Sequence, residues 1–408
     1  MSVVARKTAF TFKGKAADVR RAGRDLNVSY VLEGSVRRVA DRVRISAQLV
    51  DVASGAHIWA ERWDRNLTDI FAVQDEISQA VVAALKLKLL PEEKKAIERH
   101  GTASAEAYTL YLMARRHRAS GNEGDPRREK EIIRLARRAT EIDPNYASAW
   151  ALMALSQSLL HSRHRKAGDD GLAAAELALS LDPDLADAHA VKARHLISQG
   201  EPDEALPELE IALQLDPDSW EANKQAGLLC FRQGRFEDAI RYYRRATELM
   251  ETDFASPMLL FDCFEALGDH ESAHRAAEVA RVRAEKAVEQ DHSNGSAMAA
   301  ACLALSVLGK SEAAREWARR ALLIDPHNTL MRYNIACALG AYLGDVDEAI
   351  DMLEPLVAAA DRFELNHMKI DPELDALRED PRFQAMIAMG ESRLASRLED
   401  SPTTGSGS

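Results

Sequence analysis

β-Branched and aromatic residues alternate with polar ones over the first 66 or so residues, and this alternation separates them from the rest of the chain. A period of two is typical of strands with one buried face. Polar breaks at Ala40-Asp41 and at Ala53-Ser54-Gly55 divide the pattern into three expected strands, Tyr30–Val39, Val43–Val52 and Ala56–Trp63. Because the breaks are short, we expect an antiparallel meander.

Apolar spacings of three and four residues flank these strands on both sides. The stretch from Ala16 to Leu26 predicts a short helix. After the strands, Thr68 or Asp69 can cap a long helix that runs to about Leu89. We therefore expect a small α/β domain at the start of the chain.

From about residue 105 onward the pattern is helical, and small residues recur every 34 positions. Ala205, Ala239 and Ala273 are separated by this interval (239 − 205 and 273 − 239), as are Ala193 and Gly227 (227 − 193). The same interval links Ala178, Ala212, Ala246 and Ala280. Small residues are needed where two helices approach to ~8–10 Å, so the period predicts a repeated helix–turn–helix unit.

Proline and glycine mark the two ends of each unit. Proline stops one helix and fits the first turn of the next, so the units end at Asp143-Pro144, Asp182-Pro183, Asp216-Pro217 and Asp325-Pro326. A glycine near the turn within each unit allows left-handed geometry, at Gly200, Gly234, Gly268, Gly309 and Gly344. The interval grows to 41 before Ala321 (321 − 280), which predicts a longer helix or loop there.

The unit from Ser219 to Glu251 resembles the tetratricopeptide repeat (TPR), through Gly227, Gly234, Phe236, Ala239, Tyr243 and Ala246. We expect a mainly α protein in which residues 105–360 form a TPR α-solenoid of about six helix pairs. Residues 361–399 resemble the ending of such arrays and are expected to cap the last apolar face. Residues 91–104 are expected to be a linker, and residues 400–408 a disordered tail.

Residues 1–90 resemble the TolB-amino-terminal-like domain. The resemblance rests on the runs Tyr-Val-Leu-Glu-Gly-Ser-Val-Arg-Arg (30–38), Arg-Val-Arg-Ile-Ser-Ala-Gln-Leu-Val-Asp (42–51), Gly-Ala-His-Ile-Trp-Ala-Glu-Arg-Trp-Asp (55–64) and Asp-Ile-Phe-Ala-Val-Gln-Asp-Glu-Ile (69–77). That domain occurs in bacterial class III adenylate/guanylate cyclases, and in some winged-helix regulators, between an output domain and TPRs. The family's opening strand and helix are missing here, so we expect either a fragment of a longer protein or a sheet that lacks one strand.

The overall composition narrows the function classes. The formal charge of −12 and the sequence pI near 5.6 do not favour binding to nucleic acid or to anionic membranes. No signal peptide or run of ~20 apolar residues is present, so we expect a cytoplasmic protein without a membrane span. Widely spaced cysteines without a CxxC pattern predict reduced core residues: Cys230, Cys263, Cys302 and Cys337.

Candidate chemistry is sparse. There is no Gly-x-Ser-x-Gly elbow, and the paired metal-binding aspartates of cyclases are not recognisable. His161 and His164 have a spacing compatible with metal binding, but the neighbouring Arg163, Arg165 and Lys166 favour a solvated basic helix end. Trp59 and Trp63 share one face of a strand, where packing against the long helix is favoured over stacking on a ligand. We expect no catalytic residue, no cofactor and no metal.

The first helix of each TPR unit is expected to line a concave groove. The repeat register places Arg194 in one unit and Glu221, Lys224 and Arg232 in the next, and these four are the predicted binding residues. The cations could accept an acidic peptide, although the family's Lys/Asn carboxylate clamp is not reproduced. A hydrated charged surface is the alternative.

These patterns favour a non-catalytic regulatory or scaffolding module that binds a protein or peptide, as the interaction part of a cyclase-type signalling protein. One alternative is a sensor that binds a small molecule or a partner strand through the α/β domain. Another is the effector region of a winged-helix transcription regulator. Any cyclase activity would lie in an upstream domain absent from this chain, and the oligomeric state stays open.

Overall fold

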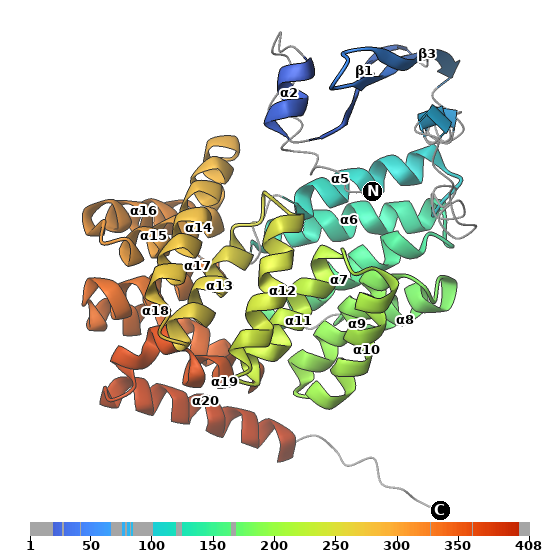
Figure 1. Cartoon of the computed structure of the whole chain (residues 1–408). Helices are drawn as coiled ribbons and strands as arrows, with labels where there is room; N and C mark the ends of the chain where they lie inside the picture. Colours follow the sequence, from blue (N-terminus) through green and yellow to red (C-terminus); the bar gives the residue numbers. More distant parts are fainter. Residues whose placement is uncertain are drawn as a thin grey trace, which may run out of the picture. The chain divides into compact units, whose positions relative to one another are not determined.

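The computed structural model describes residues 19–26, 28–40, 42–66, 76–77, 80–81, 83–84, 101–119, 125–164, 169–326, 328–360 and 362–399. These residues fall into two compact units, divided between Thr109 and Leu110. The first unit holds a three-stranded sheet, and the second holds almost all of the helices (Figure 1).

The sheet is the antiparallel meander that the alternation predicts. Its strands pair in the order β1 (Tyr30–Val39), β2 (Arg42–Asp51) and β3 (His57–Asn66), after the short helix α2 (Val19–Asp25). In the second turn Gly55 has a φ of 70°, and the Ser54 amide donates a hydrogen bond of 2.7 Å to the Asp51 carboxylate. Turn chemistry at this position therefore sets the strand register.

One face of the sheet is buried by the two tryptophans predicted to share it. The ring centroids of Trp59 and Trp63 lie 5.7 Å apart, and Trp63 packs with Val43 and Ile45 of β2. Ile77 packs on the same cluster. Most of the long helix expected over residues 68–89 lies outside the described residues.

The second unit consists of paired antiparallel helices. In the part of the chain that the structure describes there are seven pairs, one more than the six expected. They are α5 (Ala105–Arg118) with α6 (Pro126–Ile142), α7 (Ala147–His164) with α8 (Leu172–Leu181), α9 (Ala186–Gln199) with α10 (Pro202–Leu215), α11 (Trp220–Arg232) with α12 (Phe236–Leu249), α13 (Ala255–Ala266) with α14 (His270–Gln290), α15 (Gly295–Val307) with α16 (Ser311–Ile324), and α17 (Thr329–Cys337) and the π-helical η2 (Ala338–Leu343) with α18 (Val346–Ala359).

Helix ends fall where proline and glycine predict them. Asp143, Asp182, Asp216 and Asp325 are the C-cap residues of α6, α8, α10 and α16, each followed by its proline. The glycines of the intra-pair turns have φ between 70° and 83°: Gly200, Gly234, Gly268, Gly309 and Gly344. Their left-handed conformation ends the first helix and starts the second. The longer spacing before Ala321 is explained by α14, which has 21 residues where α12 has 14.

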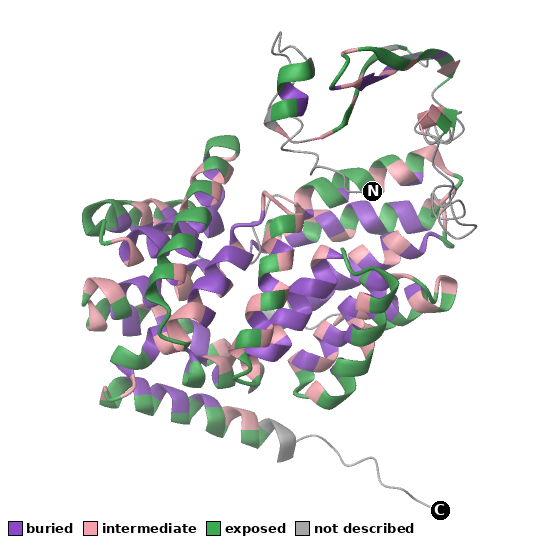
Figure 2. Cartoon of the chain, in the orientation of Figure 1, coloured by how far each residue is buried: buried purple, intermediate pink, exposed green. Residues whose placement is uncertain are grey.

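Small residues let the helices of a pair approach closely. Gly227 of α11 faces Tyr243 of α12, and a Cβ atom at residue 227 would lie 2.6 Å from the tyrosine ring. Tyr243, Ala239 and Ala246 form the buried stripe of α12. Figure 2 shows the buried residues running along the faces between helices. The 34-residue recurrence of small residues is thus a packing requirement.

Replacing Ala239 or Ala246 by leucine is expected to lower the free energy of unfolding by about 1–3 kcal/mol, because both side chains are fully buried and the core would be overpacked. Ala313→Leu on the exposed face of α16 is the matched control, with an expected change within about 0.5 kcal/mol. Urea unfolding followed by circular dichroism measures all three. Equal stability of the buried and exposed variants would contradict the packing register described here.

The chain continues beyond the last pair into a non-repeat segment. It comprises α19 (Arg362–Ile370), the 3-10 helix η3 (Pro372–Leu377) and α20 (Pro381–Glu399). Helix α20 packs on α18, whereas α19 contacts α9 and η3 contacts α13. The C-terminal segment therefore reaches back to helices that lie more than a hundred residues earlier in the sequence.

Candidate binding surface on the inner face of the array

The first helices of successive pairs surround a hollow. Residues of α9, α11, α13, α15 and α17 all line one cavity of about 230 Å³. We call the surface that these helices and α7 present the inner face. Twelve of the 13 residues of α15 are buried. This helix is covered by α14, α16 and α17, which pack against it.

Three of the four predicted binding residues come together at this cavity. Arg194 on α9, and Lys224 and Arg232 on α11, line it. Lys224 and Arg232 lie eight residues apart, close to two helical turns, so they share one face of α11. Arg194 joins them because α9 and α11 pack side by side. The cations form the basic end of the cavity.

The fourth predicted residue, Glu221, lies elsewhere on the inner face. It lines a second hollow of about 330 Å³ and pairs with Arg118 of α5, with 2.9 Å between the guanidinium Nη2 and the carboxylate Oε2. The side chains of Arg118 and Glu221 are 9% and 7% exposed. An ion pair this deeply buried makes Glu221 a structural link between α5 and α11.

Trp220 lines the second hollow and contacts one cation from the lining of each hollow. The Arg118 guanidinium and the Lys224 ammonium each lie 4.9 Å from its ring centroid, and its indole N–H donates a hydrogen bond of 2.9 Å to Asp253. Such cation–π contacts hold both cations in place on the ring faces. Lys224 is only 8% exposed as a result.

The C-terminal segment supplies a further part of the cavity wall, and sequence reasoning missed these residues. Glu364, His367 and Met368 of α19 line the cavity, together with Asp371 and Glu373 at the start of η3. The His367 ring lies 5.8 Å from the Phe231 ring and 5.6 Å from the Tyr333 ring, measured between centroids. The sequence signal was a cluster of polar residues, from Asn366 to Glu373, within the expected capping segment.

Three carboxyl groups form the acidic end of the cavity. Asp371 accepts hydrogen bonds from the Glu373 amide at 2.9 Å and from the Tyr333 hydroxyl at 2.5 Å. Glu373 accepts hydrogen bonds from the side chains of Cys337 and Tyr342. Burial, reinforced by the neighbouring carboxylates, raises the pKa of Asp262 and of Glu373 well above the usual range. These two acids are stabilised in their protonated form.

His367 lies between the acidic and basic ends. Burial lowers its pKa to about 4; the nearby Asp371 carboxylate opposes this shift, and the Arg232 guanidinium adds to it. Its Nε2 atom is 3.5 Å from the Asp371 carboxylate. The imidazole is therefore neutral at pH 7.

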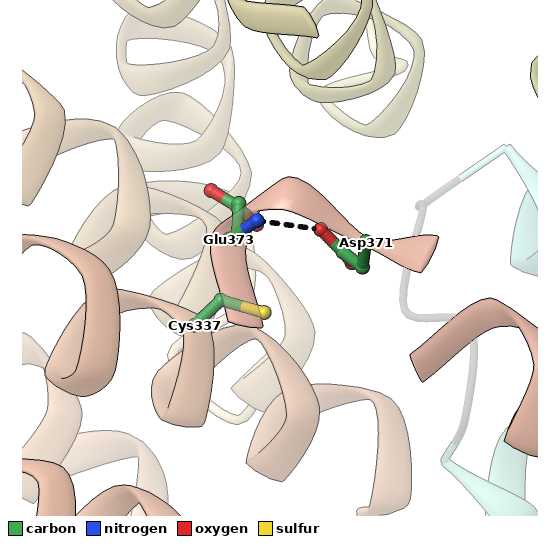
Figure 3. Close-up of side chains that lie close together, drawn as sticks. All are labelled: Cys337, Asp371 and Glu373. Atoms are coloured by element: carbon green, nitrogen blue, oxygen red, sulfur yellow. Dashed lines mark hydrogen bonds between the residues drawn. The ribbon is translucent and has the colours of Figure 1, made fainter. Parts of the chain in front are cut away.

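Cys337, Asp371 and Glu373 have donor atoms within 4.8 Å of one another, close enough to consider a metal (Figure 3). Their hydrogen bonds explain the cluster instead, because Asp371 caps η3 and Glu373 accepts from the Cys337 thiol. Burial raises the pKa of that thiol well above its usual value, so the thiolate that a metal needs is disfavoured. The trio anchors η3 to α17. The side chain of His164, from the pair considered on sequence grounds, lies outside the described residues.

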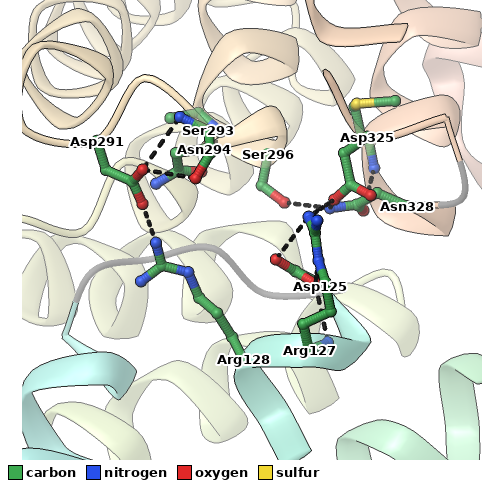
Figure 4. Close-up of polar contacts among 11 residues, drawn as sticks. Asp125, Arg127, Arg128, Asp291, Ser293, Asn294, Ser296, Asp325 and Asn328 are labelled. Atoms are coloured by element: carbon green, nitrogen blue, oxygen red, sulfur yellow. Dashed lines mark hydrogen bonds and ion pairs between the residues drawn. The ribbon is translucent and has the colours of Figure 1, made fainter. Parts of the chain in front are cut away.

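Polar contacts close the array on another side (Figure 4). Arg128 at the start of α6 pairs with Asp291, and Arg127 lies 3.6 Å from the Asp325 carboxylate. These aspartates are the C-cap residues of α14 and α16. These contacts thus link α6 to the ends of α14 and α16, which are distant from it in sequence.

The paired helices, their 34-residue period and their turns define the class: the helical unit is a TPR α-solenoid. Residues 190–252 match the family model described as a tetratricopeptide repeat. Among curated proteins, the chain is 45% identical over 153 residues to "Putative adenylate cyclase 3" of Rhizobium meliloti (strain 1021). That alignment covers 38% of this chain and 26% of the relative, so the chain spans about a quarter of the relative's length.

Solved structures with similar helical arrays have low sequence identity. YrrB, described as a TPR protein with an unusual peptide-binding site, is 22% identical, with 48% of this chain and 95% of that chain covered at a TM-score of 0.28. PilW, a type IV pilus biogenesis factor, is 19% identical, with 55% and 96% covered at 0.36. The Cut9–Hcn1 hetero-tetramer of APC/C is 16% identical, with 69% and 55% covered at 0.47.

Among the described residues, no helix has the length and apolar character that crossing a membrane requires. All four cysteines are buried and free of disulfides, in agreement with the prediction that they are reduced core residues.

Proposed function

We propose that this chain is the non-catalytic interaction part of a cyclase-type signalling protein, and that it binds a protein or peptide on the inner face of its TPR array. The observation that carries the proposal is the gathering of Arg194, Lys224 and Arg232 from two helices at one cavity. Cations held in a partly desolvated hollow favour carboxylate groups of a partner.

The link to a cyclase rests on two supports. One is the 45% identical segment of a protein named as a putative adenylate cyclase. The other is the resemblance of residues 1–90 to the TolB-amino-terminal-like domain, which accompanies TPRs in such proteins. In this proposal the cyclase reaction belongs to a separate catalytic domain. Binding of a partner to the present chain regulates that domain.

Reversing the basic end tests the proposal. Peptides are selected on the purified chain from a random phage-displayed library, and their affinities are measured by calorimetry. We expect acidic peptides to dominate, and Lys224→Glu plus Arg232→Glu to weaken their binding at least tenfold, because two attractive contacts become repulsive. The milder pair Lys224→Gln plus Arg232→Gln is made in parallel, and melting curves confirm that each variant folds.

The control reverses two cations of the second helices, Arg241→Glu plus Arg319→Glu. Their side chains are 67% and 66% exposed. Binding to this control should stay within about twofold of the original chain. Selected peptides that bind both double variants equally would rule out the inner face as their site.

A second candidate function is strand addition at the sheet. Leu32, Val36 and Val39 of β1 are 51%, 69% and 77% exposed. Apolar side chains on an outer strand favour pairing with an extended partner segment. Peptides that bind the Lys224/Arg232 variant normally but lose affinity for Val36→Lys would favour this function.

A further inference from the structure

Buried acceptor atoms without a hydrogen-bond partner in the protein line the cavity of the inner face. They include Gln225 Oε1, Asp262 Oδ1 and Glu373 Oε1, and the Nδ1 atom of His367 is also unpartnered. Buried polar atoms in folded proteins almost always form hydrogen bonds, and each unsatisfied one costs about 1–3 kcal/mol. Gln225 and Glu373 are only 2% and 6% exposed, so bulk water does not account for them. Their gathering at one hollow points to an occupant that donates hydrogen bonds.

Charge is separated along this cavity. The cations Arg194, Lys224 and Arg232 come from α9 and α11, whereas the acids come from α13 and the C-terminal segment: Asp262, Glu364, Asp371 and Glu373. His367 lies between the ends, since both Asp371 and Arg232 act on it. A ligand that matches both ends carries an anionic and a cationic group.

The remaining wall is aliphatic. Met258 and Leu259 of α13, Leu303 of α15 and Leu356 of α18 line it. The cavity volume of about 230 Å³ suits a small organic molecule or one residue of a bound peptide. An aliphatic side chain on the ligand would fit this wall.

We propose that the cavity binds a free amino acid or dipeptide with an aliphatic side chain, with its carboxylate at Arg194, Lys224 and Arg232 and its ammonium group at Asp262 and Glu373. The ammonium supplies three donors, which can reach Asp262 Oδ1 and Glu373 Oε1. An ammonium beside these two acids lowers their pKa values, so its binding displaces the protons that they otherwise keep. The inference rests on the proposed role of the inner face as the binding surface, and it specifies the class of ligand that this surface binds.

A metal ion is the competing occupant for the acidic end. The donor atoms of Cys337, Asp371 and Glu373 lie within 4.8 Å of one another, but burial keeps the Cys337 thiol protonated, and Asp371 already accepts hydrogen bonds from the Glu373 amide and the Tyr333 hydroxyl. Coordination would also involve neither the aliphatic wall nor the basic end of the cavity. An organic zwitterion uses all three regions.

Calorimetry on the full chain provides the test, with the twenty standard amino acids and the dipeptides Leu-Gly and Gly-Leu as probes. We expect leucine, methionine or one of the dipeptides to bind, and the N-acetyl and amide derivatives of that probe to bind at least tenfold more weakly. Asp262→Asn should weaken binding at least tenfold, with Asp262→Ala as the second variant. Glu271→Gln is the control, since the Glu271 side chain on α14 is 86% exposed and lies outside the cavity lining, and it should leave affinity within twofold.

Three results would overturn the inference. They are no binding by any probe, equal affinity of the blocked derivatives, and binding that Asp262→Asn leaves unchanged. Zinc chloride alone is titrated in parallel, and saturable zinc binding that excludes the amino acid and survives Asp262→Asn would also overturn it. If phage-selected peptides bind the inner face while no amino acid or dipeptide does, this inference fails and the proposed interaction function stands. If an amino acid or dipeptide binds while no selected peptide does, the peptide-binding function is refuted and the proposed small-molecule site stands.

Discussion

Arg118→Met is expected to lower the free energy of unfolding by about 3–5 kcal/mol, the largest single effect predicted for this chain. The substitution leaves the Glu221 carboxylate buried without its partner, at a position where the two side chains are 9% and 7% exposed. It also removes one of the two cations that stack on Trp220. Urea unfolding at pH 7, followed by circular dichroism and by tryptophan fluorescence, measures the change.

The double variant Arg118→Met plus Glu221→Met should recover most of this loss, because it removes both buried charges. Arg134→Met is the matched control. Arg134 forms an ion pair with Glu131 on the surface of α6, where the side chains are 66% and 36% exposed, and its loss should change stability by less than about 1 kcal/mol. If Arg118→Met were no more destabilising than Arg134→Met, Glu221 would have to be a solvated surface residue.

Acidification from pH 7 to pH 4 should destabilise the chain by up to about 3 kcal/mol through His367 alone. Its pKa is about 4 in the folded chain and near 6.5 when unfolded, so below pH 6.5 the unfolded state binds more protons and stability falls with pH. In His367→Phe, which keeps an aromatic ring against Phe231 and Tyr333, this contribution is absent. The difference in unfolding free energy between the two chains at pH 7, 6, 5 and 4 isolates it.

The comparison between the original chain and His367→Phe is needed because the buried acids change the unfolding free energy with pH in the opposite direction. The raised pKa values of Asp262 and Glu373 make the folded state bind more protons, so their contribution to stability grows as pH falls. Both acids are present in both chains, so their contributions to the unfolding free energy cancel to first order in the comparison. His270 is the control histidine: its hydrogen bond to Glu265 raises its pKa, so His270→Gln should produce no relative gain on acidification. A pH-independent difference between wild type and His367→Phe would mean that residue 367 is solvated.

Periodicity was enough to locate the helices and the basic end of the cavity. The 34-residue interval identifies the inner-facing positions of α9 and α11, and Arg194, Lys224 and Arg232 occupy such positions. In the sheet, the observed strands begin and end within a few residues of those predicted, because alternation and turn residues act over short distances.

The roles of the charged residues could not be predicted in the same way. Glu221 shares the inner face with Lys224, yet its ion-pair partner Arg118 lies 103 residues earlier in the chain. The local sequence pattern does not identify that partner. Asp262 looks like an ordinary helical carboxylate until Glu373 is placed beside it by a segment outside the repeats. Burial and pKa depend on neighbours that the chain brings together only on folding.

The sequence by itself determined the helix pairs, their turns and the side of α9 and α11 that faces inward, because these follow from spacing, small residues and caps within one repeat. The tertiary structure alone decided that α19 and η3 fold back to complete a cavity with a basic and an acidic end. It also decided that Glu221 is a structural ion-pair partner. The physical reason is that side-chain charge and accessibility are set by contacts between segments far apart in the chain, which no local period encodes.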